Sequence, residues 1–314
     1  MNYRELITQL TPQRGAGEAR AIVRLVMEER FGLTQTDLLL CKDTAFSADD
    51  RAEFEKIAQR LLSGEPVQYV LGSADFCGHR FRVTPDVLIP RPETEELVRW
   101  ALEDYPPTDS DGHISPEPDG LRILDLCTGS GCIATTLALA YPTAHVIGVD
   151  ISQKALHVAR QNATDLGATN VEFFRQNILE SDKLLVLSSR KPTPQRLTAS
   201  AAPAYPLPTS GTFDLILSNP PYVLDSEAVD MERHVLDHEP HLALFVPDDD
   251  PLRFYRSIAS IALRVLSPSG HVYVEINAVL SEETRQLFLS SNFQDVQLRH
   301  DQFGRPRLLR AQRP

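Results

Sequence analysis

Short apolar runs alternate with helical patterns between residues 121 and 276, and this alternation limits the chain to few architectures. One of the connecting helical patterns, Ser152–Leu166, has Ser152 as a plausible N-cap. Such alternation is typical of an α/β fold with a doubly wound, mostly parallel sheet. The expected strands are Leu121–Leu126, His145–Asp150, Val171–Gln176, Phe213–Ser218 and His271–Ile276.

The first 65 residues or so have a different, helical pattern. The run Glu18–Phe31 has apolar positions on one side and ends at Gly32. Ser47 and Asp50 resemble a capping box before a second helix, which Gly64 closes. Short helices joined by short loops predict a small helical bundle.

The pattern changes again between residues 64 and 92. Gly64–Gly72 is bounded by turn residues and contains β-branched residues, and Phe76–Val83 alternates like the arm of a hairpin. Pro90-Arg91-Pro92 then imposes an extended segment before a helix with acidic residues in its first turn. We therefore expect a helical domain over 1–64, a hairpin or linker over 65–92 and the α/β domain over 93–314.

Composition places the chain among globular proteins: 42% of its 314 residues are hydrophobic and 24% are charged. No apolar stretch approaches the roughly 20 residues that cross a bilayer, and the N-terminus lacks an apolar signal-peptide core. We expect a cytoplasmic protein without a membrane partner. The cysteines form no C-x-x-C pair, which predicts neither a zinc site nor a disulfide framework; they are Cys41, Cys77, Cys127 and Cys132.

The net charge of −12 is concentrated after the helical region. Residues 1–83 carry 11 Lys/Arg and 12 Asp/Glu, whereas residues 84–314 carry 20 and 31, a net of −11. A domain this acidic is repelled by a phosphate backbone. The charge therefore argues against a nucleic-acid substrate.

A glycine-rich loop joins the first expected strand to the next helix, in the order Asp125-Leu126-Cys127-Thr128-Gly129-Ser130-Gly131-Cys132-Ile133-Ala134. Its glycines permit a tight turn and a close ligand approach. Asp150 ends the following strand, where a carboxylate can accept hydrogen bonds from both ribose hydroxyls of an adenosine group. Asp125 would repel a pyrophosphate but suits the ammonium of S-adenosylmethionine, directly or through water. A helix-entry cap is the alternative role for Asp125.

The tetrapeptide Asn219-Pro220-Pro221-Tyr222 follows the fourth expected strand directly. Two prolines cannot continue a central strand, so the chain must leave the sheet in a rigid, extended turn. The turn offers the Asn219 side-chain amide and a backbone carbonyl as acceptors, with the Tyr222 ring beside them. Two acceptors and an aromatic plate suit a planar –NH2 group, and an ordinary strand-end turn is the alternative.

In a doubly wound sheet both loops open onto one crevice at the carboxyl ends of the strands. The target nitrogen would lie at Asn219 and the methyl donor on the glycine loop. Acceptors for both N–H bonds favour a pyramidal nitrogen whose lone pair points at the methyl carbon, which is catalysis by positioning. Tyr222 could stack on the planar target or pack in the core. No metal is expected, although His234, His238 and His241 are spaced i, i+4, i+7.

Nearly the whole chain resembles the release-factor glutamine methyltransferases. Beyond Asn219–Tyr222, the resemblance rests on Gly64-Glu65-Pro66-x-Gln68-Tyr69, Phe76-Cys77-Gly78, Leu88–Glu95, Asp125–Ala134, Asp150-Ile151-Ser152 and Glu239-Pro240. It implies a Rossmann-like class I methyltransferase sheet of seven mostly parallel strands. It also implies methyl transfer from S-adenosylmethionine to the glutamine of the Gly-Gly-Gln loop of peptide-chain release factors, which the N-terminal helices would dock.

The resemblance also implies site residues. Asn219, Pro220 and Tyr222 are the expected catalytic residues, and Asn219, Pro220, Pro221 and Tyr222 the expected substrate contacts. The expected cofactor contacts are Asp125, Cys127, Thr128, Gly129, Ser130, Gly131, Asp150, Asn177, Ile178 and Asn219.

Two residues depart from the family pattern. Cys127 stands where the family usually has glycine, and Asn177 stands where an acidic residue commonly contacts the adenine amino group. Asn177 can still accept that hydrogen bond through its carbonyl oxygen, with Ile178 as an apolar wall for the ring.

The residues alone are compatible with three other functions. One is methylation of an exocyclic amine of DNA or RNA, which shares the Asn219–Tyr222 motif but conflicts with the acidic charge. Another is a dinucleotide-dependent oxidoreductase, which leaves Asn219–Tyr222 unexplained. The third is a binding module without catalysis. The Pro-rich stretches Tyr105–Gly120 and Ser181–Thr212 read as surface loops, the second longer than expected, and we assign them no chemistry.

Overall fold

A computed structural model describes residues 1–40, 46–107, 120–183 and 213–314, except the side chains of 181–183. Most of the two predicted Pro-rich loops, residues 108–119 and 184–212, lies outside the described residues. The chain divides into two compact units. The first comprises Met1–Ser73, Val83–Pro85 and Met231–Glu239, and the second comprises Ala74–Arg82, Asp86–Asp230 and Pro240–Pro314.

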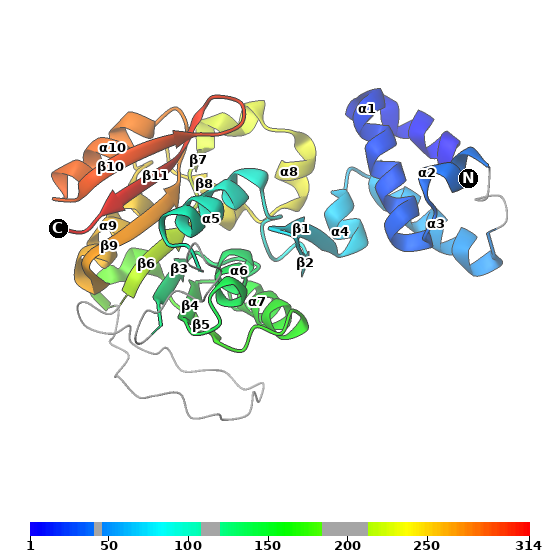
Figure 1. Ribbon diagram of the computed structural model, residues 1–314. Helices are drawn as coiled ribbons and strands as arrows, with labels where there is room; N and C mark the ends of the chain where they lie inside the picture. The colour runs from blue at the N-terminus through cyan, green and yellow to red at the C-terminus, as the bar shows by residue number, and fades with distance from the viewer. Residues whose placement is uncertain (41–45, 108–119, 184–212) are drawn as a thin grey trace. The chain divides into compact units, whose positions relative to one another are not determined.

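The first unit is a helical bundle built largely by α1 (Tyr3–Phe31), α2 (Gln35–Leu39), α3 (Ala48–Leu62) and α4 (Val67–Leu71) (Figure 1). The predicted end of the first helix is confirmed, because Gly32 adopts the left-handed conformation at the C-cap of α1. That helix begins earlier than predicted, at Tyr3. The predicted capping box of Ser47 and Asp50 is present at the start of α3.

Helix α4 corrects the expectation drawn from β-branched residues in Gly64–Gly72. Pro66 cannot donate to a ladder and stands at the N-cap, and Gly72 ends the helix with a φ of 76°. Val67 and Val70 are buried in the helical core, so burial decides against an extended segment. The hairpin predicted after it forms from β1 (Ser73–Phe76) and β2 (His79–Arg82).

The second unit contains a seven-stranded sheet in the order β10-β11-β9-β6-β3-β4-β5. The pairs β9/β6, β6/β3, β3/β4 and β4/β5 are parallel, whereas β11 pairs antiparallel with both β9 and β10. This confirms the predicted doubly wound, mostly parallel sheet. Its strands are β3 (Arg122–Leu126), β4 (His145–Asp150), β5 (Val171–Arg175), β6 (Phe213–Ser218), β9 (Leu266–Glu275), β10 (Gln294–His300) and β11 (Pro306–Gln312).

Helices cover both faces of this sheet (Figure 1). On one face lie α5 (Pro92–Asp104), α6 (Cys132–Ala140) and α7 (Gln153–Asp165), and on the other lie α9 (Arg253–Val265) and α10 (Ser281–Ser290). Strand β3 shows why the runs are apolar throughout: Ile123 packs into the first layer and Leu124 into the second. The short connecting elements are η2 (Ile178–Lys183), β7 (Val223–Leu224), η3 (Asp225–Asp230), α8 (Arg233–His238), η4 (His241–Ala243) and β8 (Phe245–Val246).

The strand order reverses between β3 and β6. From β3 the chain proceeds outward through β4 and β5, and then returns to the other side of β3 with β6 and β9. Open α/β sheets bind ligands beyond the carboxyl ends of strands at such a switch point. No helix in the described ranges is long and apolar enough to cross a membrane.

Candidate functional site

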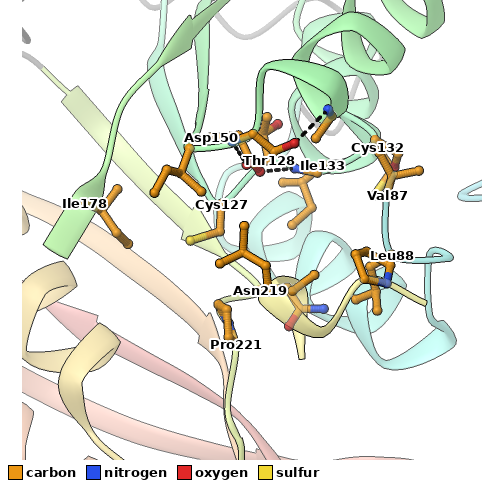
Figure 2. Close-up of a pocket in the computed structure, with 18 of the residues that line it drawn as sticks. Val87, Leu88, Cys127, Thr128, Cys132, Ile133, Asp150, Ile178, Asn219 and Pro221 are labelled. Carbon is orange, nitrogen blue, oxygen red and sulfur yellow. Dashed lines mark hydrogen bonds between the residues drawn. The ribbon is translucent and has the colours of Figure 1, made fainter. Parts of the chain in front are cut away.

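A pocket of the second unit lies at the switch point (Figure 2). The loops after β3, β4, β5 and β6 all contribute to its wall, so the sheet brings together the two motifs that the sequence singled out. Of the expected site residues, the following line the pocket: Cys127, Thr128, Gly129, Ser130, Asp150, Asn177, Ile178, Asn219 and Pro221.

The glycine loop combines one pocket-facing glycine with one packing glycine. Gly129 lines the pocket with a φ of 55°, and a Cβ at this position would meet nothing within 4 Å. Gly131, with a φ of 77°, is the N-cap of α6. A Cβ there would lie 2.9 Å from the Ala159 Cβ. Gly131 is thus required by the packing of the loop on α7, and the described pocket wall does not include it.

Asp150 supports the loop and also faces the pocket. One carboxylate oxygen accepts a hydrogen bond from the Gly129 N–H at 2.9 Å, and the other accepts one from the Ser152 N–H at 2.8 Å. Burial raises the pKa of Asp150, and these backbone hydrogen bonds oppose the rise. Each carboxylate oxygen has about two acceptor sites. Asp150 can therefore hold the loop and still accept hydrogen bonds from two vicinal hydroxyls.

Asp125 occupies a more interior position than expected. Its side chain is fully buried and is not part of the described pocket wall. One oxygen accepts hydrogen bonds from the Thr128 hydroxyl and the Ala134 N–H, which ties the loop to the first turn of α6. The other oxygen is buried without a hydrogen-bond partner among the described residues. Burial raises the pKa of Asp125 to about 7.

Cys127 adopts the left-handed backbone conformation, with a φ of 61°. A side chain costs free energy in this conformation and glycine does not, which accounts physically for the expected glycine at this position. Burial raises the pKa of the Cys127 thiol well above its usual value. The thiol is therefore a neutral part of the pocket wall.

Asn177 and Ile178 form the wall after β5. The Asn177 carbonyl oxygen accepts a hydrogen bond from the Leu179 N–H at 3.1 Å, and its amide donates to Glu180 at 3.0 Å. The carbonyl oxygen keeps a second acceptor site for a ligand amine. Ile178 is buried beside it and presents an apolar surface.

The Asn-Pro-Pro-Tyr turn divides its residues between the pocket and the core. Asn219 and Pro221 line the pocket, whereas Pro220 and Tyr222 are not among its described lining residues. The Tyr222 ring packs against the core cluster under the sheet, and the Arg307 guanidinium lies 5.7 Å from its centre. Tyr222 in this structure has the core-packing arrangement rather than an open ring face in the pocket.

A buried carboxylate connects Asn219 with Tyr222. Glu275, at the end of β9, accepts hydrogen bonds from the Thr94 hydroxyl at 2.6 Å and the Tyr222 hydroxyl at 2.7 Å. The Asn219 Nδ2 in turn donates to the Thr94 hydroxyl oxygen at 3.0 Å. Sequence reasoning assigned no role to Thr94 or Glu275. Thr94 lies within the matched segment Leu88–Glu95, which was the available signal.

Other pocket residues also lacked a prediction. Apolar side chains close the pocket wall and limit water around the polar groups. They include Val87, Leu88, Ile133, Leu242 and Phe254. No group of three or more His, Cys, Asp or Glu side chains within the described ranges is arranged to hold a metal ion.

Two family models match separate parts of the chain. Residues 117–297 match the family model described as a methyltransferase domain, and residues 4–72 match the PrmC N-terminal domain. The release factor glutamine methyltransferase of Bacteroides thetaiotaomicron is 40% identical, over 94% of this chain and 93% of that protein. The protein of the same name from Flavobacterium psychrophilum is 36% identical, over 99% and 98% of the two chains. That from Chlorobaculum tepidum is 37% identical, over 90% and 87%.

Proposed function

The chain belongs to the family of release factor glutamine methyltransferases, and from that premise we propose how its site works. The enzyme transfers a methyl group from S-adenosylmethionine to the side-chain amide nitrogen of the glutamine in the Gly-Gly-Gln loop of peptide-chain release factors. The observation that carries the mechanism is that the glycine loop, Asp150 and Asn219 line one pocket.

The residues of the pocket fit S-adenosylmethionine. Asp150 has acceptor sites left for the ribose hydroxyls, Gly129 leaves room beside the backbone, and Ile178 offers an apolar surface for the adenine ring. The unpartnered oxygen of Asp125 is a buried acceptor behind the loop, which supports its expected role toward the cofactor's ammonium, directly or through water. When bound, the cofactor supplies an activated methyl group on a positively charged sulfur.

Asn219 holds the target amide. The nitrogen of an amide is a weak nucleophile because its lone pair is delocalised into the carbonyl group. The Asn219 carbonyl oxygen and a backbone carbonyl of the turn accept the two N–H bonds and favour a pyramidal nitrogen. Pro221 and the apolar pocket wall limit the orientations of the target and exclude water.

The acidic charge supports a protein substrate over a nucleic acid. The net charge of −12 is concentrated in residues 84–314, so a phosphate backbone would be repelled from the domain that carries the pocket. This disfavours the alternative of an exocyclic amine of DNA or RNA.

The N-terminal and C-terminal domains have different roles in this proposal. We assign docking of the release factor to the N-terminal helical domain, residues 1–64, with 65–92 as hairpin and linker and 93–314 as the catalytic domain. The two family models match separate parts of the chain, residues 4–72 and 117–297, which supports two domains, and the helical part extends past residue 64 because α4 belongs to the helical core. We also infer a cytoplasmic location, which the unpaired Cys77, Cys127 and Cys132 support.

Transfer of a labelled methyl group tests this function. The enzyme is incubated with methyl-labelled S-adenosylmethionine and, separately, a release factor, the same factor with its Gly-Gly-Gln glutamine replaced by alanine, RNA or DNA. Label should enter only the unaltered release factor. Asn219→Ala should abolish transfer and retain cofactor binding measured by calorimetry. Label in nucleic acid but not in the release factor would refute the assignment.

A further inference from the structure

Glu275 is a buried carboxylate to which neither the family resemblance nor the pocket wall assigns a function. Its side chain is 1% exposed, and both of its oxygens accept hydrogen bonds from hydroxyl groups. Burial raises the pKa of Glu275, and the Thr94 and Tyr222 hydroxyls and the Arg307 charge oppose the rise. Three groups from distant parts of the chain thus converge on this one carboxyl group.

The carboxylate determines where the protons of its neighbours lie. Each of the two Glu275 oxygens accepts a hydrogen bond from one hydroxyl, and each hydroxyl has one proton to donate. Thr94 and Tyr222 therefore both direct their protons at Glu275. With its proton committed, the Thr94 oxygen can only accept a further hydrogen bond.

The direction of the hydrogen bond from Thr94 to Glu275 fixes the orientation of the Asn219 side chain. The side-chain amide of an asparagine has an NH2 end and a carbonyl end of nearly the same shape. Because the Thr94 oxygen can only accept, Asn219 must turn its NH2 end toward Thr94, as the Nδ2–Oγ1 distance of 3.0 Å records. Its carbonyl oxygen is left free of Thr94 at the pocket, which Asn219 and Thr94 both line.

We propose that Glu275 is a positioning residue that acts through Thr94 to keep the Asn219 carbonyl oxygen facing the target amide. The inference rests on the proposed function in one respect, that the target presents an N–H group. With the amide reversed, the NH2 of Asn219 would face the NH2 of the target, and two donors cannot bond. Tyr222 contributes by holding the other Glu275 oxygen, which gives the tyrosine of Asn-Pro-Pro-Tyr a role without stacking.

Three substitutions separate this role from plain structural support. Glu275→Gln replaces one of the two acceptor oxygens with an NH2 group, so Thr94 and Tyr222 can no longer both donate to this side chain and the constraint on Asn219 is weakened. Thr94→Val removes the hydroxyl with little change of shape. Thr94→Ser keeps the hydroxyl. Thr284→Val is the matched control, because the buried Thr284 hydroxyl donates to the carbonyl of Leu280, the N-cap residue of α10, at 2.8 Å.

The measurements are kcat for release-factor methylation, S-adenosylmethionine affinity by calorimetry, and the side-chain amide NMR signal of Asn219, assigned with Asn219→Asp. Glu275→Gln and Thr94→Val should lower kcat about tenfold to a hundredfold, as for loss of one preorganised hydrogen-bonding group. They should leave cofactor affinity unchanged and shift the Asn219 signal. Thr94→Ser should retain most of the kcat that Thr94→Val loses, and Thr284→Val should match the parent in all three.

Wild-type kcat in Thr94→Val, or equal losses in Thr94→Ser and Thr94→Val, would overturn the proposal. If Glu275→Gln does not fold, the comparison of Thr94→Val with Thr94→Ser still tests the proposal. Failure of the proposed function has a different signature: the parent enzyme would not methylate the release factor at all. The NMR signal of the Asn219 amide can be measured without substrate. It therefore tests the orientation of Asn219 even if the enzyme does not methylate the release factor.

Discussion

Cys127 lines the pocket and also has a strained backbone conformation. Its φ of 61° is in the left-handed region of backbone conformation. Glycine adopts this region freely, whereas β-branched residues strongly avoid it. The left-handed backbone of the loop is the source of this strain.

Cys127→Val should therefore lower the free energy of unfolding by about 1–3 kcal/mol, the usual cost of a strained backbone conformation. Cys127→Gly should stay within about 1 kcal/mol of the parent, because relief of strain offsets the greater freedom of the unfolded chain. Urea unfolding provides the measurement. Cys132→Val, in the first turn of α6, is the control with an ordinary helical backbone. Equal stability of Cys127→Val and Cys127→Gly would exclude strain at this position.

Asp125 makes stability depend on pH. Burial raises its pKa in the folded protein from an ordinary 3.8 to about 7, so between these values the folded chain binds more protons than the unfolded chain. The contribution of Asp125 to stability therefore falls as pH rises from 4 to 7. Asp125→Asn lacks this dependence, so the parent should lose stability relative to the variant over that window. Chemical unfolding at several pH values measures the difference, and a constant or rising difference would contradict the assignment.

At the scale of the element, the glycine loop depends on contact between α6 and α7. Gly131→Ala would place a Cβ 2.9 Å from the Ala159 Cβ at a φ of 77°. We expect it to lower the free energy of unfolding by about 2–4 kcal/mol, from crowding and backbone strain together.

Gly129→Ala is the matched control, since its φ is also positive but nothing lies within 4 Å of the added Cβ. Gly129→Ala should lower the free energy of unfolding only through backbone strain, by about 1 kcal/mol. Thermal unfolding of both variants compares them directly. Equal losses would show that packing on α7 does not explain Gly131.

Local signals made these elements predictable. The run Phe213–Ser218 and the following prolines place a strand and its end within a few residues, and both are in the structure as β6 and the turn after it. Val67–Leu71 was not predictable in this way, because burial in the helical core outweighed the β-branched composition.

The network behind Asn219 belongs to the scale of the whole molecule. Thr94 lies 125 residues from Asn219 and 181 residues from Glu275 in the chain. No periodicity or spacing reports such a contact, because it exists only after the strands have taken their order in the sheet. Sequence alone thus located the loops that line the pocket, but not the buried groups behind them.

Docking by the N-terminal helical domain predicts a change in substrate affinity alone. Leu39 and Leu40 are 69% and 66% exposed, large apolar side chains on the surface of the helical unit. Replacing both with serine should raise KM for the release factor several-fold through lost apolar contact, with kcat and cofactor affinity unchanged.

Phe303→Ser is the control, because Phe303 is 68% exposed but belongs to the other unit. Steady-state kinetics with varied release factor compares the variants. An unchanged KM in the Leu39/Leu40 double variant would remove this part of the helical domain from the docking surface.

The position of the transferred methyl group tests the central claim most directly. A release factor treated with the enzyme and isotope-labelled S-adenosylmethionine is digested, and tandem mass spectrometry locates the label. The account predicts one labelled methyl group on the side-chain nitrogen of the Gly-Gly-Gln glutamine. No label on that glutamine, or label on another residue instead, would contradict it.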